Sequence, residues 1–303
     1  MKRLSTLILA LSAAIGLVST AGAQESGTLK KIRDSGSITI GHRDASIPFS
    51  YYDDKQQPVG YAMDLCMRIV DAVRTELKMP KLDVKYQLVT SANRIPLMAN
   101  GTIDLECGST TNNAARQKEV AFAITHVLTA NRIVSKKTAG LKGEGDLKGK
   151  TMVSTSGTTN IKQLTDLNTS KSMGMNIIPA NGHPEAFQMV ETGRAVGFAM
   201  DDILLYSLVA SSRNPSEFVI SDFALSLPEP YGIMMRKDDP GFKKVVDSTL
   251  ARIYKSGEVM KIYNRWFLSP IPPKNINLNV PLTSQMKNLF SNPTDSPDPA
   301  AYK

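Results

Sequence analysis

The sequence predicts an α/β protein built from two lobes, one of which is inserted into the other. Short apolar runs that are typical of strands alternate with helix-like segments along the whole chain. Its 303 residues suffice for two domains of about 100–200 residues each. Two extended segments, residues 120–134 and 231–236, separate a middle block that has an α/β rhythm of its own. We expect residues 24–129 and 228–303 to form lobe 1, residues 130–227 to form lobe 2, and the two crossing segments to form a hinge.

Residues 1–23 carry the pattern of a signal peptide for export. Lys2 and Arg3 precede an apolar stretch at residues 7–18, and Ala21-Gly22-Ala23 provides the small residues of a cleavage site. The apolar stretch is shorter than the roughly 20 apolar residues that span a bilayer. We therefore expect the mature chain to be released, soluble, into a bacterial periplasm.

The elements of lobe 1 follow from hydrophobic periodicity. Apolar runs bounded by turn residues predict strands, and apolar residues spaced three and four apart predict helices. In chain order these elements are a strand at 37–43, a helix at 61–77, a strand at 84–89, a helix at 94–98 and a strand at 103–107, then helices at 239–255 and around Trp266 after the insertion. Ser91 is expected to cap the helix at 94–98, and the polar, proline-bearing residues 292–303 are expected to fray.

Lobe 2 shows the same alternation of strand and helix. Its strands are expected at 152–155, 176–179 and 195–200, and its helices after Gly157-Thr158-Thr159, at 184–192 and at 202–210. Two α/β lobes joined by two chain crossings place a ligand site in the cleft between them.

The charge balance argues against a nucleic-acid partner. The chain has 36 Lys and Arg against 28 Asp and Glu, a net charge of +8, and removal of the two basic residues of the signal leaves +6. This modest excess suits anionic ligands or aids solubility. No basic cluster is interleaved with aromatic residues in the way that nucleic-acid binding requires.

Neither a metal nor a cofactor is expected. The three histidines, His42, His126 and His183, lack metal-ligand spacing. The sequence contains no nucleophile elbow, Walker loop or zinc-binding helix. Cys66 and Cys107 allow either a disulfide in an oxidising compartment or two buried thiols, and the sequence does not decide between them.

Residues 106–116 are the most informative stretch of the chain. A strand-like run leads into Gly108, a cluster of hydroxyl residues and then Arg116. Glycine permits close approach of the backbone, hydroxyl and amide groups at a helix start bind anions, and a guanidinium pairs with a carboxylate through two bonds. Ser109, Thr111 and Arg116 therefore predict a clamp for a small acid. A capped helix with an ordinary surface arginine is the alternative.

Three further candidates lie in lobe 2. The turn Ser156-Gly157-Thr158-Thr159 repeats the glycine-and-hydroxyl arrangement, which makes Thr159 a candidate for the opposite jaw of the clamp. His183 lies in a turn before a helix, where a solvated role is the alternative. Asp201 and Asp202 end an apolar strand, so that one carboxylate suits the cleft and the other suits the cap of the next helix.

Two further arginines are candidates for the cleft. Arg43 ends the first strand, where open α/β sheets bind ligands, although a pair with Asp44 in a charged turn is the alternative. Arg94 follows Ser91 by three residues, so both side chains lie near one helix start; a solvated helix face is the alternative. Cationic groups together with one aspartate suit a ligand that has carboxylates and an ammonium group.

These motifs recur together in one family. They include Glu106-Cys107-Gly108-Ser109-Thr110-Thr111-Asn112-Asn113 and the segments 41–43, 47–52, 90–91, 93–97, 155–159, 193–196, 200–202, 236–240 and 264–267. From about Leu29 to Leu289 the chain resembles the periplasmic glutamate/aspartate-binding proteins of ABC importers, within family 3 of the solute-binding proteins. The motifs are long and ordered, and they cover nearly the whole mature chain. Cys66 and Ile233 depart from the expected pattern, so no disulfide is carried over from the family.

The resemblance implies a two-lobed periplasmic-binding-protein fold of type II and a role for each candidate. Arg116, Ser109 and Thr111 would hold the α-carboxylate of an amino acid, and Asp201 would hold its α-ammonium. The pocket for the side-chain carboxylate would be formed by Arg43, Ser91, Arg94, Thr159 and His183. The implied function is capture of L-glutamate and L-aspartate by a monomer and their delivery to the membrane permease subunits of an ABC importer, without catalysis.

Two other functions are weighed against this one. An exported enzyme on the same fold, such as a dehydratase of a cyclic carboxylic acid, would use Glu106 or His183 as its acid or base. A receptor's sensor module would need a membrane helix or a fused domain, and we expect neither. The arginine set, which is complete for an acidic amino acid, favours the binding protein.

Overall fold

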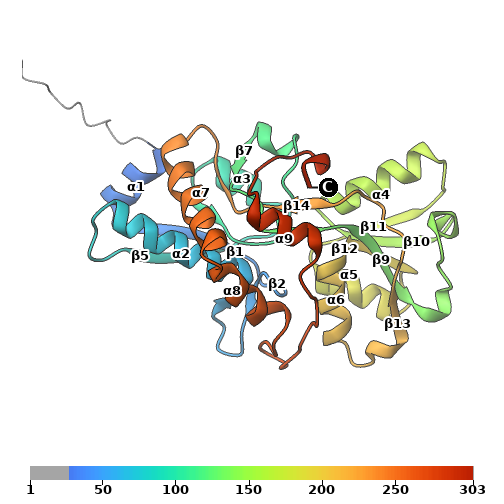
Figure 1. The fold of residues 1–303 in the computed structure, drawn as a ribbon. Helices are drawn as coiled ribbons and strands as arrows, with labels where there is room; N and C mark the ends of the chain where they lie inside the picture. The colour runs from blue at the N-terminus through green and yellow to red at the C-terminus, as the bar shows by residue number, and fades with distance from the viewer. Residues whose placement is uncertain (1–26, 303) are drawn as a thin grey trace, which may run out of the picture.

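The computed structural model describes residues 27–302, and the signal peptide expected at residues 1–23 lies outside them. The strands form two separate five-stranded sheets, each covered by helices, and the two α/β units lie side by side (Figure 1). The predicted α/β class and the two-lobed architecture are confirmed. Within residues 27–302, none of the helices has the length and apolar character that crossing a bilayer requires.

The first sheet has the strand order β5-β1-β6-β15-β7. β1 pairs in parallel with β5 and β6, whereas β15 runs antiparallel to β6 and β7. Its strands are β1 (Ser37–His42), β5 (Asp83–Leu88), β6 (Leu105–Glu106), β7 (Val120–Phe122) and β15 (Met234–Arg236). The helices of this unit are α1 (Gly27–Ser35), α2 (Tyr61–Glu76), α3 (Arg94–Ala99), α7 (Pro240–Lys255), α8 (Glu258–Phe267) and α9 (Ser284–Ser291).

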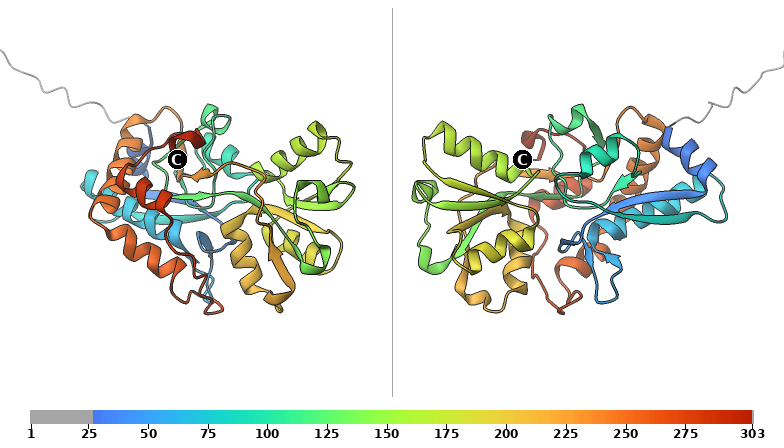
Figure 2. Two further views of the ribbon diagram at one scale, coloured as in Figure 1. Left: turned by 45° about the vertical axis from the view of Figure 1, so that its right-hand side comes forward. Right: turned by 180° about the vertical axis from the view of Figure 1, so that it is seen from behind.

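The second sheet has the order β11-β10-β12-β9-β13. β10 is parallel to β11 and β12, and β9 is antiparallel to β12 and β13. Its elements are β9 (Asn131–Lys136), β10 (Thr151–Thr155), α4 (Thr159–Ser170), β11 (Asn176–Ala180), α5 (His183–Glu191), β12 (Gly197–Asp201), α6 (Asp202–Ser211) and β13 (Phe218–Ile220). α4 lies on one face of this sheet and α5 and α6 lie on the other, as both views of Figure 2 show. The predicted strands at 152–155, 176–179 and 195–200 and the predicted helices at 184–192 and 202–210 agree with the structure within one or two residues at each end, and α4 begins at the predicted turn.

The chain passes between the two sheets at two places. β8 (Val127–Thr129) leads directly into β9, and β14 (Glu229–Tyr231) returns the chain from β13. β8 and β14 pair with each other as a two-stranded antiparallel ladder. The prediction of one long strand at residues 120–134 was wrong, because this segment changes partners. The amide of Ala123 donates to Ile233 O and the amide of Thr125 donates to Thr294 O, which splits the segment into β7, β8 and β9.

The second crossing segment is also divided. Residues 231–236 form the end of β14 and the separate strand β15, so the prediction of a single strand was wrong. Gly232 lies between them, and its amide donates to Thr110 O rather than to a sheet partner. A Cβ atom at Gly232 would lie 3.1 Å from the ring of Phe122, so the break occurs where the backbone passes close to a packed side chain.

The C-terminal tail does not fray within the described residues. The hydroxyls of Tyr302 and Thr125 lie 2.7 Å apart, and the side-chain amide of Asn112 donates to Asp295 O at 2.8 Å. Tyr302 is 4% exposed. The tail therefore packs against Asn112 and against the segment between β7 and β8, and the prediction of fraying was wrong because a buried tyrosine fixes this polar segment. The remaining short elements are β2 (Ala45–Ser46), β3 (Ser50–Tyr52), β4 (Pro58–Val59) and the 3₁₀ turns η1 (Arg116–Lys118), η2 (Lys137–Ala139), η3 (Glu144–Leu147), η4 (Pro215–Glu217) and η5 (Pro299–Tyr302).

A disulfide joins Cys66 on α2 to Cys107, which directly follows β6. This resolves the two alternatives that the sequence left open, and no free cysteine is present among the described residues. The bond closes a chain separation of 41 residues. It fixes the end of β6, and hence the turn that carries Ser109, to the buried face of α2.

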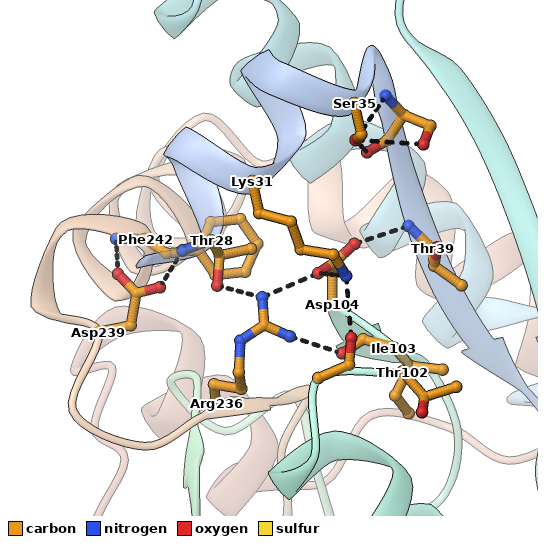
Figure 3. A network of polar contacts seen from close by, with 12 residues as sticks. Thr28, Lys31, Ser35, Thr39, Thr102, Ile103, Asp104, Arg236, Asp239 and Phe242 are labelled. Carbon is orange, nitrogen blue, oxygen red and sulfur yellow. Dashed lines mark hydrogen bonds and ion pairs between the residues drawn. The ribbon is translucent and has the colours of Figure 1, made fainter. Parts of the chain in front are cut away.

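A network around the buried Asp104 joins the N-terminal helix to the first sheet (Figure 3). Asp104 Oδ1 accepts from Lys31 Nζ at 2.9 Å and from Arg236 Nη2 at 2.8 Å, while Oδ2 accepts from the amide of Thr39 at 2.9 Å. Arg236 also donates to the hydroxyl of Thr28. One carboxylate thus joins α1, β1 and β15.

Replacing Asp104 with asparagine is expected to lower the free energy of unfolding by about 1.5–3 kcal/mol, the range for hydrogen bonds to charged groups. The amide keeps the shape but leaves Lys31 and Arg236 without their shared counter-charge. The matched control is Asp34→Asn, which removes an exposed ion pair with Lys30 on the same helix and should cost at most about 0.5 kcal/mol. Urea denaturation compares the two variants, and equal midpoints would contradict the role given to Asp104.

Candidate functional site

A small cavity lies between the two α/β units. The lining residues come from both units: Ser91, Arg94, Ser109 and Thr111 from the first, and Thr158, Thr159, Asn160, His183, Met200, Asp201 and Leu204 from the second. All the residues predicted from the sequence line this cavity except Arg43 and Arg116, which lie beside it.

The sheet topology explains why these residues meet. Each of them follows the carboxyl end of a parallel strand, and in open α/β sheets ligands bind at that edge. Arg43 follows β1, Ser91 and Arg94 follow β5, Ser109 and Thr111 follow β6, Thr159 follows β10, His183 follows β11, and Asp201 ends β12. The carboxyl-end edges of the two sheets face each other. Residues more than a hundred positions apart in the sequence, such as Ser91 and Asp201, therefore line the same cavity.

Unpartnered polar atoms gather at this place. Buried side-chain atoms without a hydrogen-bond partner are rare in folded proteins. Six such atoms belong to predicted site residues: Arg43 Nε and Nη1, Ser91 Oγ, Arg94 Nε, Ser109 Oγ and His183 Nε2. Every one of them is able to donate a hydrogen bond. The arrangement therefore presents donors, three of them on guanidinium groups, to an acceptor that carries negative charge.

Arg94 is held in place by a short polar chain. Its Nη1 donates to Ser109 O at 3.2 Å and to the hydroxyl of Thr110, which in turn donates to Glu106 Oε2. Glu106 Oε1 lies 3.9 Å from Arg94 Nη1, and both side chains are buried. These bonds fix one end of the guanidinium and leave Nε for the cavity.

Ser91 does not cap α3, so that prediction was wrong. The cap position is Asn93, whose side chain exchanges bonds with Thr90: the amide of Thr90 donates to Asn93 Oδ1, and the amide of Asn93 donates to Thr90 Oγ1. Because its neighbours supply the turn, Ser91 keeps a buried hydroxyl without a protein partner. Because the Ser91 hydroxyl is not used in a helix cap, it is available to bond a ligand in the cavity.

Arg43 is 3% exposed. Its backbone amide donates to Ser50 Oγ, whereas its side-chain Nε and Nη1 have no hydrogen-bond partner. Burial, followed by the nearby charge of Arg94, lowers the pKa of Arg43 to about 10. The group is still charged at neutral pH. Two buried guanidinium groups that repel each other favour the binding of an anion between them.

His183 is the first residue of α5 and is 3% exposed, so the solvated alternative does not hold. Burial, together with the charges of Arg43 and Arg94, lowers the pKa of His183 well below its ordinary value. The ring is therefore neutral at pH 7. Its Nδ1 lies 2.9 Å from the hydroxyl of Thr155. With Thr155 donating to Nδ1, Nε2 carries the proton and is a donor directed at the cavity.

Asp201 presents the one carboxylate in the wall of the cavity. Its Oδ1 accepts from Asn160 Nδ2 at 2.8 Å, and its Oδ2 accepts from the hydroxyl of Tyr231 on β14. Burial raises the pKa of Asp201, and these two hydrogen bonds oppose that rise. Asp201 also occupies the N-cap position of α6, but its side chain makes no capping bond. Asp202 is the first residue of the helix, and its Oδ1 accepts from the amide of Ile203. The buried carboxylate of Asp201 faces the cavity as expected, whereas the expected N-cap by the other aspartate is not formed.

Arg116 joins the two units at the edge of the cavity. Its Nη1 donates to Thr111 O at 2.8 Å, and its Nη2 donates to Gly157 O at 3.2 Å. Burial and the charge of Arg94 lower the pKa of Arg116 to about 10. The hydroxyls of Thr111 and Thr159 lie 3.3 Å apart across the same boundary. The two turns that form the predicted clamp, around Thr111 and around Thr159, therefore contact each other directly.

Sequence reasoning missed four residues that support the site. Asn160 and Tyr231 hold Asp201, Thr155 orients His183, and Thr110 orients Arg94. Asn160 and Thr110 adjoin predicted residues, so a wider reading of the two hydroxyl turns would have included them. Tyr231 gave no such signal, because only the fold brings β14 to the end of β12. No group of three or more metal-ligating side chains occurs within residues 27–302.

Comparison with known proteins identifies the family. The sequence profile of the bacterial extracellular solute-binding proteins, family 3, matches residues 38–269. The chain belongs to this family. A relative from Pseudomonas aeruginosa, the L-glutamate/L-aspartate-binding protein, is 51% identical over 292 residues, which are 96% of each chain. The glutamate/aspartate import solute-binding protein of Escherichia coli K12 is 47% identical over 289 residues, or 95% of each chain.

Solved structures of the family share this fold. A mutant of the arginine-binding protein of Thermotoga maritima superposes with a TM-score of 0.68 at 27% identity, covering 78% of this chain and 98% of that chain. The two-lobed architecture is therefore the type II fold of periplasmic amino-acid-binding proteins, and the cavity described above lies between its two α/β units.

Proposed function

We propose that this chain is a periplasmic solute-binding protein that captures L-glutamate and L-aspartate and delivers them to an ABC importer. The observation that carries this proposal is the group of buried, unpartnered donors on Arg43, Arg94 and His183 beside the carboxylate of Asp201. That pairing of cationic and anionic groups complements an amino acid with a second carboxylate. The names of the relatives at 47–51% identity support the same ligands.

The proposed contacts divide the ligand into three parts. The α-carboxylate is assigned to Arg116, Ser109 and Thr111, and the α-ammonium to Asp201. The side-chain carboxylate is assigned to the remaining predicted residues: Arg43, Ser91, Arg94, Thr159 and His183. A buried charge is costly unless it is paired and hydrogen-bonded, and two guanidinium groups with a neutral imidazole donor meet that need. The neutral amide of glutamine would leave the arginines without a counter-charge.

Capture would proceed by closure of the lobes. We assign residues 24–129 and 228–303 to lobe 1 and residues 130–227 to lobe 2, with β8 and β14 as the hinge. A ligand selects the closed form only as far as it contacts both lobes, and contacts at Ser109 and Asp201 would ensure this. The closed form would then dock, as a monomer, on the membrane permease subunits.

Catalysis by an enzyme of this fold is the less favoured function. Of the two acid–base candidates, Glu106 does not line the cavity and is bonded to Thr110 beneath Arg94. His183 does line it, but its lowered pKa makes it a hydrogen-bond donor rather than an effective acid at neutral pH. The close relatives are named as binding proteins.

The test is isothermal titration of the mature protein, refolded free of carried ligand, against four amino acids. Glutamate and aspartate are expected to bind tightly, and glutamine and asparagine at least about 100-fold more weakly, because a buried charge left unpaired costs about 3–5 kcal/mol. Equal binding of the amides would contradict the assignment of Arg43, Arg94 and His183. Failure to bind any of the four, with turnover of a cyclic acid, would establish the enzyme instead.

A further inference from the structure

Glu229 has a buried carboxyl group next to the proposed site, and none of the proposed ligand contacts involves this group. It is 7% exposed and is the first residue of β14, opposite Thr129 in the hinge ladder. Its Oε1 accepts from Gln163 Nε2 at 3.0 Å, and its Oε2 lies 3.2 Å from Ser226 Oγ. In the part of the chain that the structure describes, no ion pair joins Glu229 to a basic side chain. Asp104, which is also buried, has two cations and a backbone amide as partners.

The contacts of Glu229 join the hinge to lobe 2. Gln163 lies on α4, the helix that begins with Thr159 and also carries Asn160. Its side-chain oxygen accepts from Asn131 Nδ2 at 2.7 Å, so one amide connects the start of β9 to Glu229. Glu229 and Tyr231 stand two residues apart on β14, hence on the same face, and Tyr231 bonds Asp201. A single strand therefore contacts lobe 2 at two points next to the site.

The charged groups that act on Glu229 from other elements are Asp201 on β12 and Arg116 on η1. Burial, reinforced by the charge of Asp201, raises the pKa of Glu229 from 4.5 to about 8, whereas the bonds from Gln163 and Ser226 and the charge of Arg116 act in the opposite direction. Asp201 has two donors from neutral groups and the proposed ligand ammonium, so it keeps its charge. Of two carboxyl groups that interact this strongly, one holds the proton.

We propose that Glu229 is a specificity-determining residue, which takes up a proton when the lobes close and thereby leaves the site with one net positive charge for the second carboxylate of an acidic amino acid. The charges are those of three arginines, Arg43, Arg94 and Arg116, against three carboxyl groups, Glu106, Asp201 and Glu229. If all six are ionised the site is neutral, and a neutral ligand such as glutamine balances it. With Glu229 protonated, the site matches the net charge of −1 of glutamate or aspartate.

This inference rests on the proposed function and predicts a coupling of binding to pH. A carboxyl group whose pKa rises on closure gains a proton on binding at pH values between its pKa in the open form and its pKa in the closed form, about 8. Its contribution to affinity is complete at low pH and is lost as the pH rises through that window. For one proton, the affinity for glutamate changes by up to about tenfold per pH unit. Both carboxylates of free glutamate stay ionised between about pH 6 and 8. The α-amino group is common to glutamate and glutamine, so its titration does not affect the preference between them.

The experiment measures dissociation constants for glutamate and glutamine at about pH 6, 7 and 8 for the mature wild type, Glu229→Gln and the control Glu76→Gln. Glu76 is exposed at the end of α2, far from the hinge. Glutamine at position 229 can still accept from Gln163 and donate to Ser226, but it is permanently neutral. The wild type and Glu76→Gln should lose glutamate affinity as the pH rises, by more than about tenfold over the two units, and should lose their preference over glutamine in parallel. In Glu229→Gln, the affinity for glutamate and the preference for glutamate over glutamine should both be independent of pH.

Equal pH profiles in all three proteins would overturn the inference, and so would a level profile in the wild type. If Glu229→Gln does not fold, calorimetry of the wild type in two buffers of different ionisation enthalpy counts the protons directly. Uptake of close to one proton per glutamate supports the inference, and no uptake overturns it. These results are distinct from a failure of the proposed function, in which glutamate would not bind the wild type at any pH.

Discussion

Replacing Arg94 with alanine is expected to weaken glutamate binding by about 2–5 kcal/mol, or roughly 30- to 5,000-fold, the range for breaking a buried charge pair. Arg94 is 2% exposed and keeps Nε free for the cavity while Nη1 is held by Ser109 and Thr110. Binding of glutamine should change much less, since it lacks the carboxylate that the arginine meets. Isothermal titration measures both ligands.

The matched control is Arg74→Ala, which removes a half-exposed arginine paired with Asp71 on α2. It should leave both affinities unchanged. Since Arg94→Ala also strips Glu106 of its nearest cation, Arg94→Lys is measured in parallel: it keeps the charge but loses the planar fork. A lysine variant with intermediate affinity is expected. Near wild-type affinity in the alanine variant would remove Arg94 from the pocket.

Replacing Gly157 with alanine is expected to weaken glutamate binding by about 1–3 kcal/mol, or roughly 5- to 150-fold, because overpacking would prevent full contact between the lobes. A Cβ atom at Gly157 would lie 2.6 Å from Ala92 Cα and 2.7 Å from Ser91 O, both of them backbone atoms across the cleft. Backbone moves less easily than a side chain, so the upper half of this range applies. Small-angle scattering with saturating glutamate should show a larger radius of gyration than the wild type.

Gly157 also has a φ of +75°, a conformation that strains alanine without any clash. The control is therefore Gly174→Ala, a residue of the same lobe with a φ of +62° and no atom within 4 Å of its Cβ position. It carries the same kind of backbone strain but touches nothing across the cleft, so its affinity should equal that of the wild type. Equal losses in both variants would show that strain, not closure, is the cause.

Much of the fold could be predicted from the sequence because strands and helices alternate along the chain in both lobes, and each such element has its own local pattern of apolar residues. The sequence located β10, β11, α5, β12 and α6 within one or two residues, and the turn at residues 157–159 located the start of α4. The two crossing segments were misread for one physical reason. Residues 120–134 and 231–236 are mostly apolar, which favours extended chain, but the chain changes its hydrogen-bonding partners within them, and those partners come from distant parts of the sequence.

The site could be predicted to a similar degree. Polar residues directly after strand ends pointed to a shared edge, and the structure brings Ser91, Ser109, Thr159, His183 and Asp201 around one cavity. What the sequence could not show is which groups hold these residues. The bonds from Tyr231 to Asp201 and from Thr155 to His183 depend on tertiary packing alone. The same holds for Glu229, whose importance lies in its burial at the hinge.

The cleft is proposed to bind an amino acid that has two carboxylates, one at each end of the donor set. A crystal structure of the mature protein with L-glutamate tests this directly. We expect the ammonium on Asp201, the side-chain carboxylate within hydrogen-bonding distance of Arg94 Nε and His183 Nε2, and the α-carboxylate beside Arg116 and Ser109. A ligand bound elsewhere, or one whose side-chain carboxylate faces neither Arg94 nor His183, would contradict it.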